Sequence, residues 1–345
     1  MAGCAFEDAL TGATIAFDRE TGGVGVEEAD AGPVPCRSLF FPGCSMITYA
    51  LPLVEAVHAT LREAGEVDGA SLLCCGKILE YEPHGKELRA SFEGDLVGLV
   101  AATGTERIVA ACPNCVRALR EALERDERTA GVVVEPLPAV LAGLGYRIDR
   151  DAAARLVKGD PTAPLALCPH DSCPDRATGE FAEGLRALLP EGAWREGEHH
   201  HRASLCCGSK LRAAGRFEAA DELACRNGEE ALAVEADAIV TACLSCAFQL
   251  NMAQPCVQAV HYLELLYQWR VDWTDMASWV KFRFLTPGAL AKMEREESAR
   301  TFLGLGAPTL SDEVLAAEGR TAPLQDVMAA SDVALSNADV RAIAE

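Results

Sequence analysis

The chain has 345 residues, half of them hydrophobic, and a formal net charge of −21. This length fits two ordinary domains or one duplicated unit, and the hydrophobic content supports a buried core. The negative charge argues against nucleic acid or an anionic membrane surface as a partner. No apolar run is long enough to cross a bilayer, and the first residues lack the features of a secretory leader. We therefore expect a cytoplasmic protein without a transmembrane segment.

The first predicted element is a polar, glycine-bearing segment of residues 1–36, which we expect to form an irregular arm or a short hairpin. Strands and helices then alternate. Hydrophobic patterning predicts strands at 37–44, 70–73, 107–111 and 132–135, and helices at 48–64, 86–102, 112–124 and 137–144. Short connections between such elements predict a parallel sheet covered by helices.

The same order of elements returns in the second half of the chain. Strands are predicted at 165–167, 238–242 and 256–260, and helices at 177–188, 213–234, after Cys246 and at 261–269. The fold is therefore expected to be α/β, with two pseudo-symmetric Rossmann-like units and parallel sheets. We place the first unit at 37–150, the second at 151–270 and a helical C-terminal extension at 271–345.

Ten of the 15 cysteines form two copies of one pattern, in which a lone cysteine precedes a Cys-Cys-Gly and then a Cys-x-x-Cys. The first copy consists of Cys44, Cys74, Cys75, Cys112 and Cys115, and the second of Cys173, Cys206, Cys207, Cys243 and Cys246. The gaps between the elements are 29 and 36 residues in the first copy and 32 and 35 in the second. In a reducing compartment such thiols are metal-binding or catalytic rather than paired in disulfides. The repeat thus predicts two sites that gather soft ligands for iron.

The arrangement within each copy favours an iron–sulfur centre over zinc. A zinc ribbon uses two Cys-x-x-Cys knuckles, whereas each copy here has only one. Adjacent cysteines diverge from an extended chain, so the vicinal pairs suit a multi-iron centre better than a single tetrahedral ion. Gly76 and Gly208 would let the backbone approach the inorganic core. Each Cys-x-x-Cys opens a helix, whose N–H groups and dipole stabilise anionic sulfur.

The residues around these cysteines carry a family resemblance. They are Pro42-Gly-Cys44, Cys74-Cys-Gly76, Ala111-Cys-Pro-Asn-Cys-Val-Arg117, His170-Asp-Ser-Cys173, Cys206-Cys-Gly208 and Thr241-Ala-Cys-Leu-Ser-Cys246. Over roughly residues 37–270 the chain resembles the cysteine-rich CCG-domain family, whose domain occurs twice in one subunit of heterodisulfide reductase and in related iron–sulfur redox subunits. The resemblance implies two noncubane [4Fe-4S] clusters, each held by one five-cysteine set. The match of His170-Asp-Ser-Cys173 favours Cys173 over Cys168 as the first ligand of the second set.

The sequence also bears on electron supply and substrate. It contains no ferredoxin-type cluster motif, dinucleotide-binding glycine loop or Walker loop. We therefore expect electrons to come from a separate iron–sulfur or flavoprotein subunit, which part of the 271–345 tail would contact. A small disulfide is a candidate substrate. Lys77 and Lys210, close behind the two CCG motifs, are candidates for holding an anionic group of it, although they also fit solvated surface lysines.

Three functions stay open at this point. The leading one is an oxidoreductase subunit resembling the CCG-domain subunit of heterodisulfide reductase, which reduces a disulfide or a related two-electron acceptor. The second is an electron-transfer subunit of a flavin-linked dehydrogenase of the glycolate, lactate or glycerol-3-phosphate type, delivering electrons to a quinone or a protein. The third is a non-catalytic scaffold stabilised by zinc.

Overall fold

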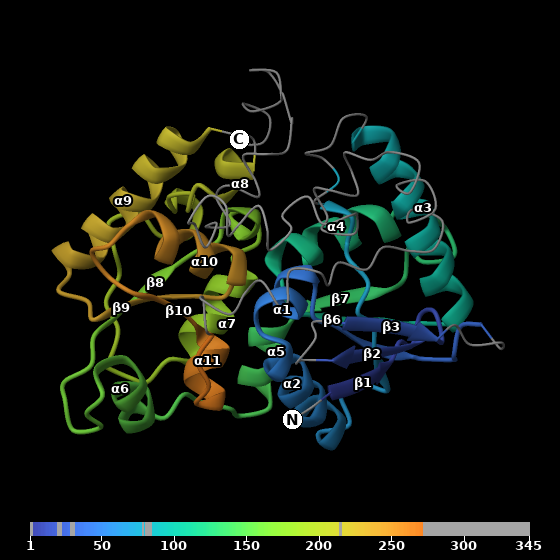
Figure 1. Ribbon diagram of the computed structural model, residues 1–345, viewed down its shortest axis with the longest axis horizontal. Coiled ribbons are helices and arrows are strands. Elements are labelled where there is room, and N and C mark those ends of the chain that lie inside the picture. Colours follow the sequence, from blue (N-terminus) through green and yellow to red (C-terminus); the bar gives the residue numbers. More distant parts are fainter. Residues whose placement is uncertain are drawn as a thin grey trace.

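The computed structural model describes residues 3–18, 23–27, 32–77, 79, 85–213 and 216–271. Their strands form three separate sheets. Figure 1 shows two α/β units side by side, with the N-terminal sheet (dark blue) below the first unit. This mixed α/β architecture with two parallel sheets confirms the predicted fold class. The predicted C-terminal helices at 272–345 lie outside the described residues.

The N-terminal segment is more regular than predicted. It forms a three-stranded antiparallel sheet of β1 (Gly3–Glu7), β2 (Thr14–Asp18) and β3 (Gly23–Glu27), so the expectation of an irregular arm or one hairpin was wrong by one strand. Directly after β1, Asp8 pairs with Ala70 at the edge of the first parallel sheet, and Ala9 N donates to Ala70 O at 2.9 Å. The N-terminal segment thus covers a strand edge that would otherwise be open.

The first unit contains the parallel sheet β5-β4-β6-β7. Its strands are β4 (Ser38–Phe41), β5 (Gly69–Ala70), β6 (Arg107–Ala110) and β7 (Val133–Pro136). Its helices are α1 (Cys44–Tyr49), α2 (Leu51–Glu63), α3 (Gly85–Thr103), α4 (Pro113–Leu123) and α5 (Leu137–Gly143). The single helix predicted at 48–64 is in fact two, because the backbone breaks at Ala50, whose φ is −148°.

The second unit contains the parallel sheet β10-β9-β8. Its strands are β8 (Leu167–His170), β9 (Ala238–Thr241) and β10 (Ala259–His261). Its α-helices are α6 (Arg150–Lys158), α7 (Glu180–Leu188), α8 (Ser209–Ala213), α9 (Phe217–Ala233), α10 (Leu244–Ala253) and α11 (Tyr262–Tyr267), with short 3-10 turns at Cys173–Asp175 and His201–Ala203. The first strand lies later than the predicted 165–167, so Cys168 is inside it. Among the described residues no strand of this sheet corresponds to β5.

The burial of the central strands explains why short hydrophobic runs in the sequence predicted them. All four residues of β8 and of β9 are buried, as are three of the four in β4 and in β6. Strands of parallel sheets are covered on both faces, so they consist of nearly continuous apolar residues. No helix in the described part of the chain is long and apolar enough to span a membrane.

The two units pack directly against each other. Helices α5 and α7 approach so closely that a Cβ on Gly184 would lie 2.7 Å from Ala139 N. Near the cysteine-bearing edge, the rings of Tyr49 and Phe248 stack with centroids 5.3 Å apart. These contacts join helices from both halves, so the carboxyl edges of the two sheets are held in a fixed relation.

Asp8 joins the N-terminal sheet to the first unit. Its carboxylate is fully buried and accepts hydrogen bonds from Leu72 N at 2.7 Å, Ser71 Oγ at 2.9 Å and Leu10 N at 3.0 Å. Replacing Asp8 by Ala would leave several buried donors without an acceptor, each costing about 1–3 kcal/mol.

We predict that Asp8→Ala lowers the free energy of unfolding by about 3 kcal/mol or more, measured by thermal or denaturant unfolding. Glu106→Ala is the control, because the ion pair of Glu106 with Arg37 is largely exposed on both sides and exposed pairs contribute little. Equal stability of the two variants would show that Asp8 does not anchor the N-terminal sheet.

Candidate metal centre

The cysteines of the two repeats lie at the carboxyl ends of the parallel strands. In the first sheet the chain leaves β4 toward β5 on one side and later returns to β6 on the other. Ligands of open α/β sheets bind where strand order reverses in this way. Cys44 begins the helix after β4, and Cys112 follows β6. In the second unit Cys173 follows β8 and Cys243 follows the adjacent β9.

In the first set, Cys75 lies between the thiols of Cys74 and Cys115. Its pKa is well below the usual value because the thiols of Cys115 and Cys74 donate hydrogen bonds to its sulfur, while burial opposes the shift. The pKa of Cys74 is raised, first by its hydrogen bond with Cys44. Gly43 makes room for this group, because a Cβ there would lie 2.8 Å from Cys115 Sγ.

The second set has the same internal order. The Sγ atoms of Cys206 and Cys173 lie 4.0 Å apart. The pKa of Cys206 falls to about 2 because Cys173 and then Cys207 donate hydrogen bonds to its sulfur. The pKa of Cys207 is raised, first by its hydrogen bond with Cys206, and Cys246 contacts Cys207 in turn. All five thiols are free.

The two sets meet between the Cys-x-x-Cys segments. The pKa of Cys243 is well below its usual value because Cys112, from the other unit, and Cys246 donate hydrogen bonds to its sulfur. Beside this contact, Ser45 Oγ and Ser245 Oγ are 2.7 Å apart. The ten sulfurs thus form one connected group, in which neighbouring thiols are hydrogen-bonded to one another. Metal ions displace thiol protons when they bind the sulfurs as thiolates.

Two helix N-termini lie at the contact between Cys112 and Cys243. Cys112 is the N-cap of α4 and Cys243 is the N-cap of α10, both with extended backbone. The N–H groups of a first helical turn have no partner within the helix, and the helix dipole favours negative charge there. The predicted start of a helix at each Cys-x-x-Cys segment is thus confirmed, and both features favour negative charge on the N-cap sulfurs.

Comparison with known proteins identifies the repeat. The model of the cysteine-rich domain CCG matches residues 38–120 and 169–251. The chain carries two CCG domains. None of the curated proteins matches the chain. Among solved structures, the glutamate racemase isoform RacE1 from Bacillus anthracis aligns with 12% identity and a TM-score of 0.30, over 66% of this chain and 77% of that one.

The CCG match confirms the family resemblance predicted from the cysteine pattern. Together with the clustered thiols, it points to an iron–sulfur redox role. The assignment of individual cysteines as ligands stays a prediction, as do the number and type of the clusters.

In both CCG domains, the glycine that follows the vicinal cysteines forms the turn and donates a hydrogen bond to the first sulfur of the pair. Gly76 N and Gly208 N each donate to the sulfur of the first cysteine of the pair, Cys74 or Cys206, at 3.4 Å. Both glycines have positive φ, +76° and +92°. A Cβ on Gly208 would lie 2.4 Å from Ala220 O. The described contacts therefore show a requirement for glycine that sequence reasoning missed: helix α9 passes directly behind the turn.

Cations surround the two CCG turns. Lys77 is half-buried, and its pKa is lowered to about 8, first by burial and then by the charges of Arg89, Lys210 and Arg117. Glu121 opposes this shift. Lys77 and Lys210 come from different units, and their charges lie close enough together to affect each other. The chain is strongly acidic overall, which makes this local concentration of positive charge distinctive.

Cys168, the alternative first ligand, lies away from the sulfur contacts described above. It is a buried residue of β8, and burial, followed by the charges of Glu230 and Glu196, raises its pKa to about 11. A thiol in such surroundings is poorly suited to becoming a thiolate. The geometry therefore favours Cys173, whose Sγ lies beside that of Cys206.

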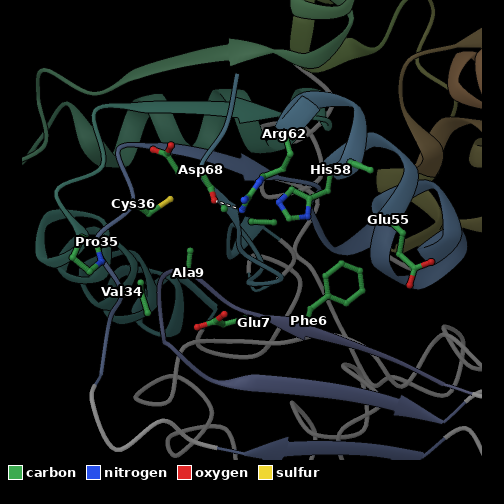
Figure 2. Close-up of a pocket in the computed structure, with 13 residues that line it drawn as sticks. Phe6, Glu7, Ala9, Val34, Pro35, Cys36, Glu55, His58, Arg62 and Asp68 are labelled. Atoms are coloured by element: carbon green, nitrogen blue, oxygen red, sulfur yellow. Dashed lines mark hydrogen bonds between the residues drawn. The ribbon is translucent and has the colours of Figure 1, made fainter. Parts of the chain in front are cut away.

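A separate pocket of about 390 Å³ lies between the N-terminal sheet and α2 (Figure 2). Phe6, Cys36, His58, Arg62 and Asp68 are among the residues that line it. Burial is the main reason that the pKa of Cys36 rises to about 11. Cys36 precedes β4, so this pocket is at the amino end of the first sheet, away from the CCG cysteines.

Sequence reasoning missed the surroundings of the second site. His170 was noted only as part of the family motif, yet its ring is buried close to the thiols of Cys207 and Cys246. Burial lowers the pKa of His170, although its hydrogen bond with Asn227 opposes the shift. Ser172 Oγ lies 3.9 Å from Cys246 Sγ. The position of His170 immediately before a predicted ligand was the available signal.

We predict that Gly208→Ala destabilises the protein and reduces metal uptake, because the new Cβ collides with Ala220 backbone atoms. Gly192→Ala is the matched control: Gly192 also has positive φ, +72°, but a Cβ there meets nothing within 4 Å. Left-handed strain alone costs about 1 kcal/mol, so Gly208→Ala should have the clearly lower melting temperature. Similar melting temperatures and metal content for both variants would rule out the proposed close packing of α9.

Proposed function

We propose that this protein is a redox subunit resembling the CCG-domain subunit of heterodisulfide reductase, and that it reduces a disulfide or a related two-electron acceptor. The proposed cofactors are two noncubane [4Fe-4S] clusters. The proposed ligands are Cys44, Cys74, Cys75, Cys112 and Cys115 for the first cluster, and Cys173, Cys206, Cys207, Cys243 and Cys246 for the second. The single observation that carries this proposal is the junction of two complete five-thiol sets at Cys112 and Cys243.

The donor sets fit iron–sulfur centres. The sulfurs are free and at least partly buried, and within each set they contact one another. Thiolates are the usual ligands of iron–sulfur clusters, and backbone N–H groups near the sulfurs raise the reduction potential. The amides of Gly76 and Gly208 are such donors. Two bound clusters would supply one electron each, so that an S–S bond breaks and two protons complete two thiols.

The residues around the site suit an anionic substrate. Lys77 and Lys210 belong to different units and affect each other's charge, so we expect both to attract an anion near the CCG turns. The side chain of Arg89 is 16% exposed and is held by Glu93 at 2.6 Å. These cations favour a disulfide that carries carboxylate or phosphate groups. Electrons would come from a partner iron–sulfur or flavoprotein subunit, since the sequence has no flavin or ferredoxin motif.

We predict about eight iron and eight sulfide ions per chain after anaerobic purification. Cys112→Ser and Cys243→Ser should each lower the iron content, because each removes a ligand at the junction. Cys256→Ser should not, since Cys256 is exposed and outside the repeats. Fewer than about four irons per chain would contradict the two-cluster proposal, and zinc without sulfide would support a structural scaffold instead.

We predict that the reduced protein is reoxidised by an anionic disulfide, and that Lys77→Gln or Lys210→Gln raises the dissociation constant for that disulfide by about 3- to 10-fold. Lys158→Gln is the control, because Lys158 pairs with Asp237 at the surface of the second unit. Spectra recorded during titration with the disulfide give both the rate and the affinity. Reoxidation by a quinone or a protein acceptor but by no disulfide would favour the electron-transfer alternative.

A further inference from the structure

The two cysteine sets have the same pattern, but one position next to them holds an apolar residue in the first unit and a histidine in the second. The last residue of the first strand, three positions before the lone cysteine, is Phe41 in the first unit and His170 in the second. Both side chains are buried, at 0% and 6% exposure. Only the second site therefore has a nitrogen donor at this position.

The hydrogen bonds of Asn227 fix the orientation of the His170 ring. The Asn227 amide nitrogen donates to the carbonyl oxygens of Cys206 at 3.1 Å and Leu223 at 2.8 Å. Its oxygen is therefore an acceptor, and it lies 2.8 Å from His170 Nδ1. In the neutral ring Nδ1 thus carries the proton, and Nε2 presents a lone pair.

Nε2 of His170 has no hydrogen-bond partner among the described residues. A ring nitrogen of His170 lies within 4.8 Å of the sulfurs of both Cys207 and Cys246. Because Nδ1 is held by Asn227, Nε2 is the nitrogen left to bind a metal beside these thiols. A buried polar atom without a partner is costly. An imidazole lone pair of this kind, next to thiolates and with its other nitrogen held by a hydrogen bond, is typical of a metal-ligating histidine.

We propose that His170 Nε2 is a sixth protein ligand at the second site and binds iron beside Cys207 and Cys246. This rests on the proposed iron–sulfur function. The first centre then has only sulfur ligands, whereas the second has nitrogen and sulfur ligands. Histidine ligands raise the reduction potential of an iron–sulfur centre, so the second centre is the better electron acceptor of the two. Asn227 is a positioning residue, since it holds the ring in the tautomer that leaves Nε2 free to bind.

The first test uses the full-length protein, prepared anaerobically and taken to each paramagnetic state in a redox titration. Pulsed EPR should detect an imidazole nitrogen coupled to one centre, and the coupling should change when the protein is made with ¹⁵N-labelled histidine. This measurement needs no variant, so it stands even if a substituted protein fails to fold.

His170→Phe copies the first unit at this position. It should abolish the nitrogen coupling, keep most of the iron and lower the reduction potential of one centre while leaving the other unchanged. His58→Phe is the matched control, because His58 Nε2 is also buried without a partner among the described residues, but His58 lines the pocket at the other edge of the first sheet. This control should keep both the coupling and the potentials.

Two outcomes would overturn the ligand assignment while leaving the proposed function intact. One is iron-loaded wild-type protein without strong histidine coupling, and the other is a coupling that survives in His170→Phe. A protein that takes up zinc but forms no iron–sulfur centre would instead refute the proposed function itself.

Discussion

The continuity of the cysteine-rich edge depends on the contact between the thiols of Cys112 and Cys243, which the packing of the two units brings together. These cysteines are the N-cap residues of α4 and α10, which belong to different CCG domains. Burial removes the hydration of their sulfurs and disfavours negative charge on them, so the contact needs support from both sides. The hydrogen bond of Ser45 with Ser245 and the stacking of Tyr49 on Phe248 provide it. Because both come from helices next to the cysteines, movement of one unit against the other would disturb the metal-binding edge directly.

The sequence predicted two groups of cysteines that follow parallel strands, but it did not predict how the two groups lie relative to each other. The alternation of strands and helices and the positions of the cysteines follow from local patterns, since crossover helices join neighbouring parallel strands. The meeting of Cys112 with Cys243 depends on the packing of α5 against α7 and of α1 against α10. Those contacts join residues far apart in the chain, and the hydrophobic periodicity of the sequence does not predict such long-range contacts. For the same reason the pairing of Asp8 with Ala70, and with it the regular N-terminal sheet, escaped prediction.

The repeat is less symmetric in structure than in sequence. In place of β5, the second sheet has among the described residues only the isolated parallel bridge of Trp194 with Leu167, and the turn of its vicinal pair packs against α9. Gly208 packs against Ala220 of this helix, whereas Gly76 packs against the ring of Phe92. The same helix supplies Asn227, which binds His170. Helix α9 therefore positions both the CCG turn and the histidine of the second site.

Near the two CCG turns, the local positive charge has more effect on a small anion than the negative net charge of the chain. A chain with a net charge of −21 should repel an anionic substrate at long range. Salt screens such repulsion beyond roughly 8–10 Å, while Lys77, Lys210, Arg89 and Arg117 lie close enough together to act on one another. The carboxylate of Glu121 offsets only part of this charge. The positive groups therefore dominate the local charge near the two CCG turns, and they also offset the negative charge of the thiolates.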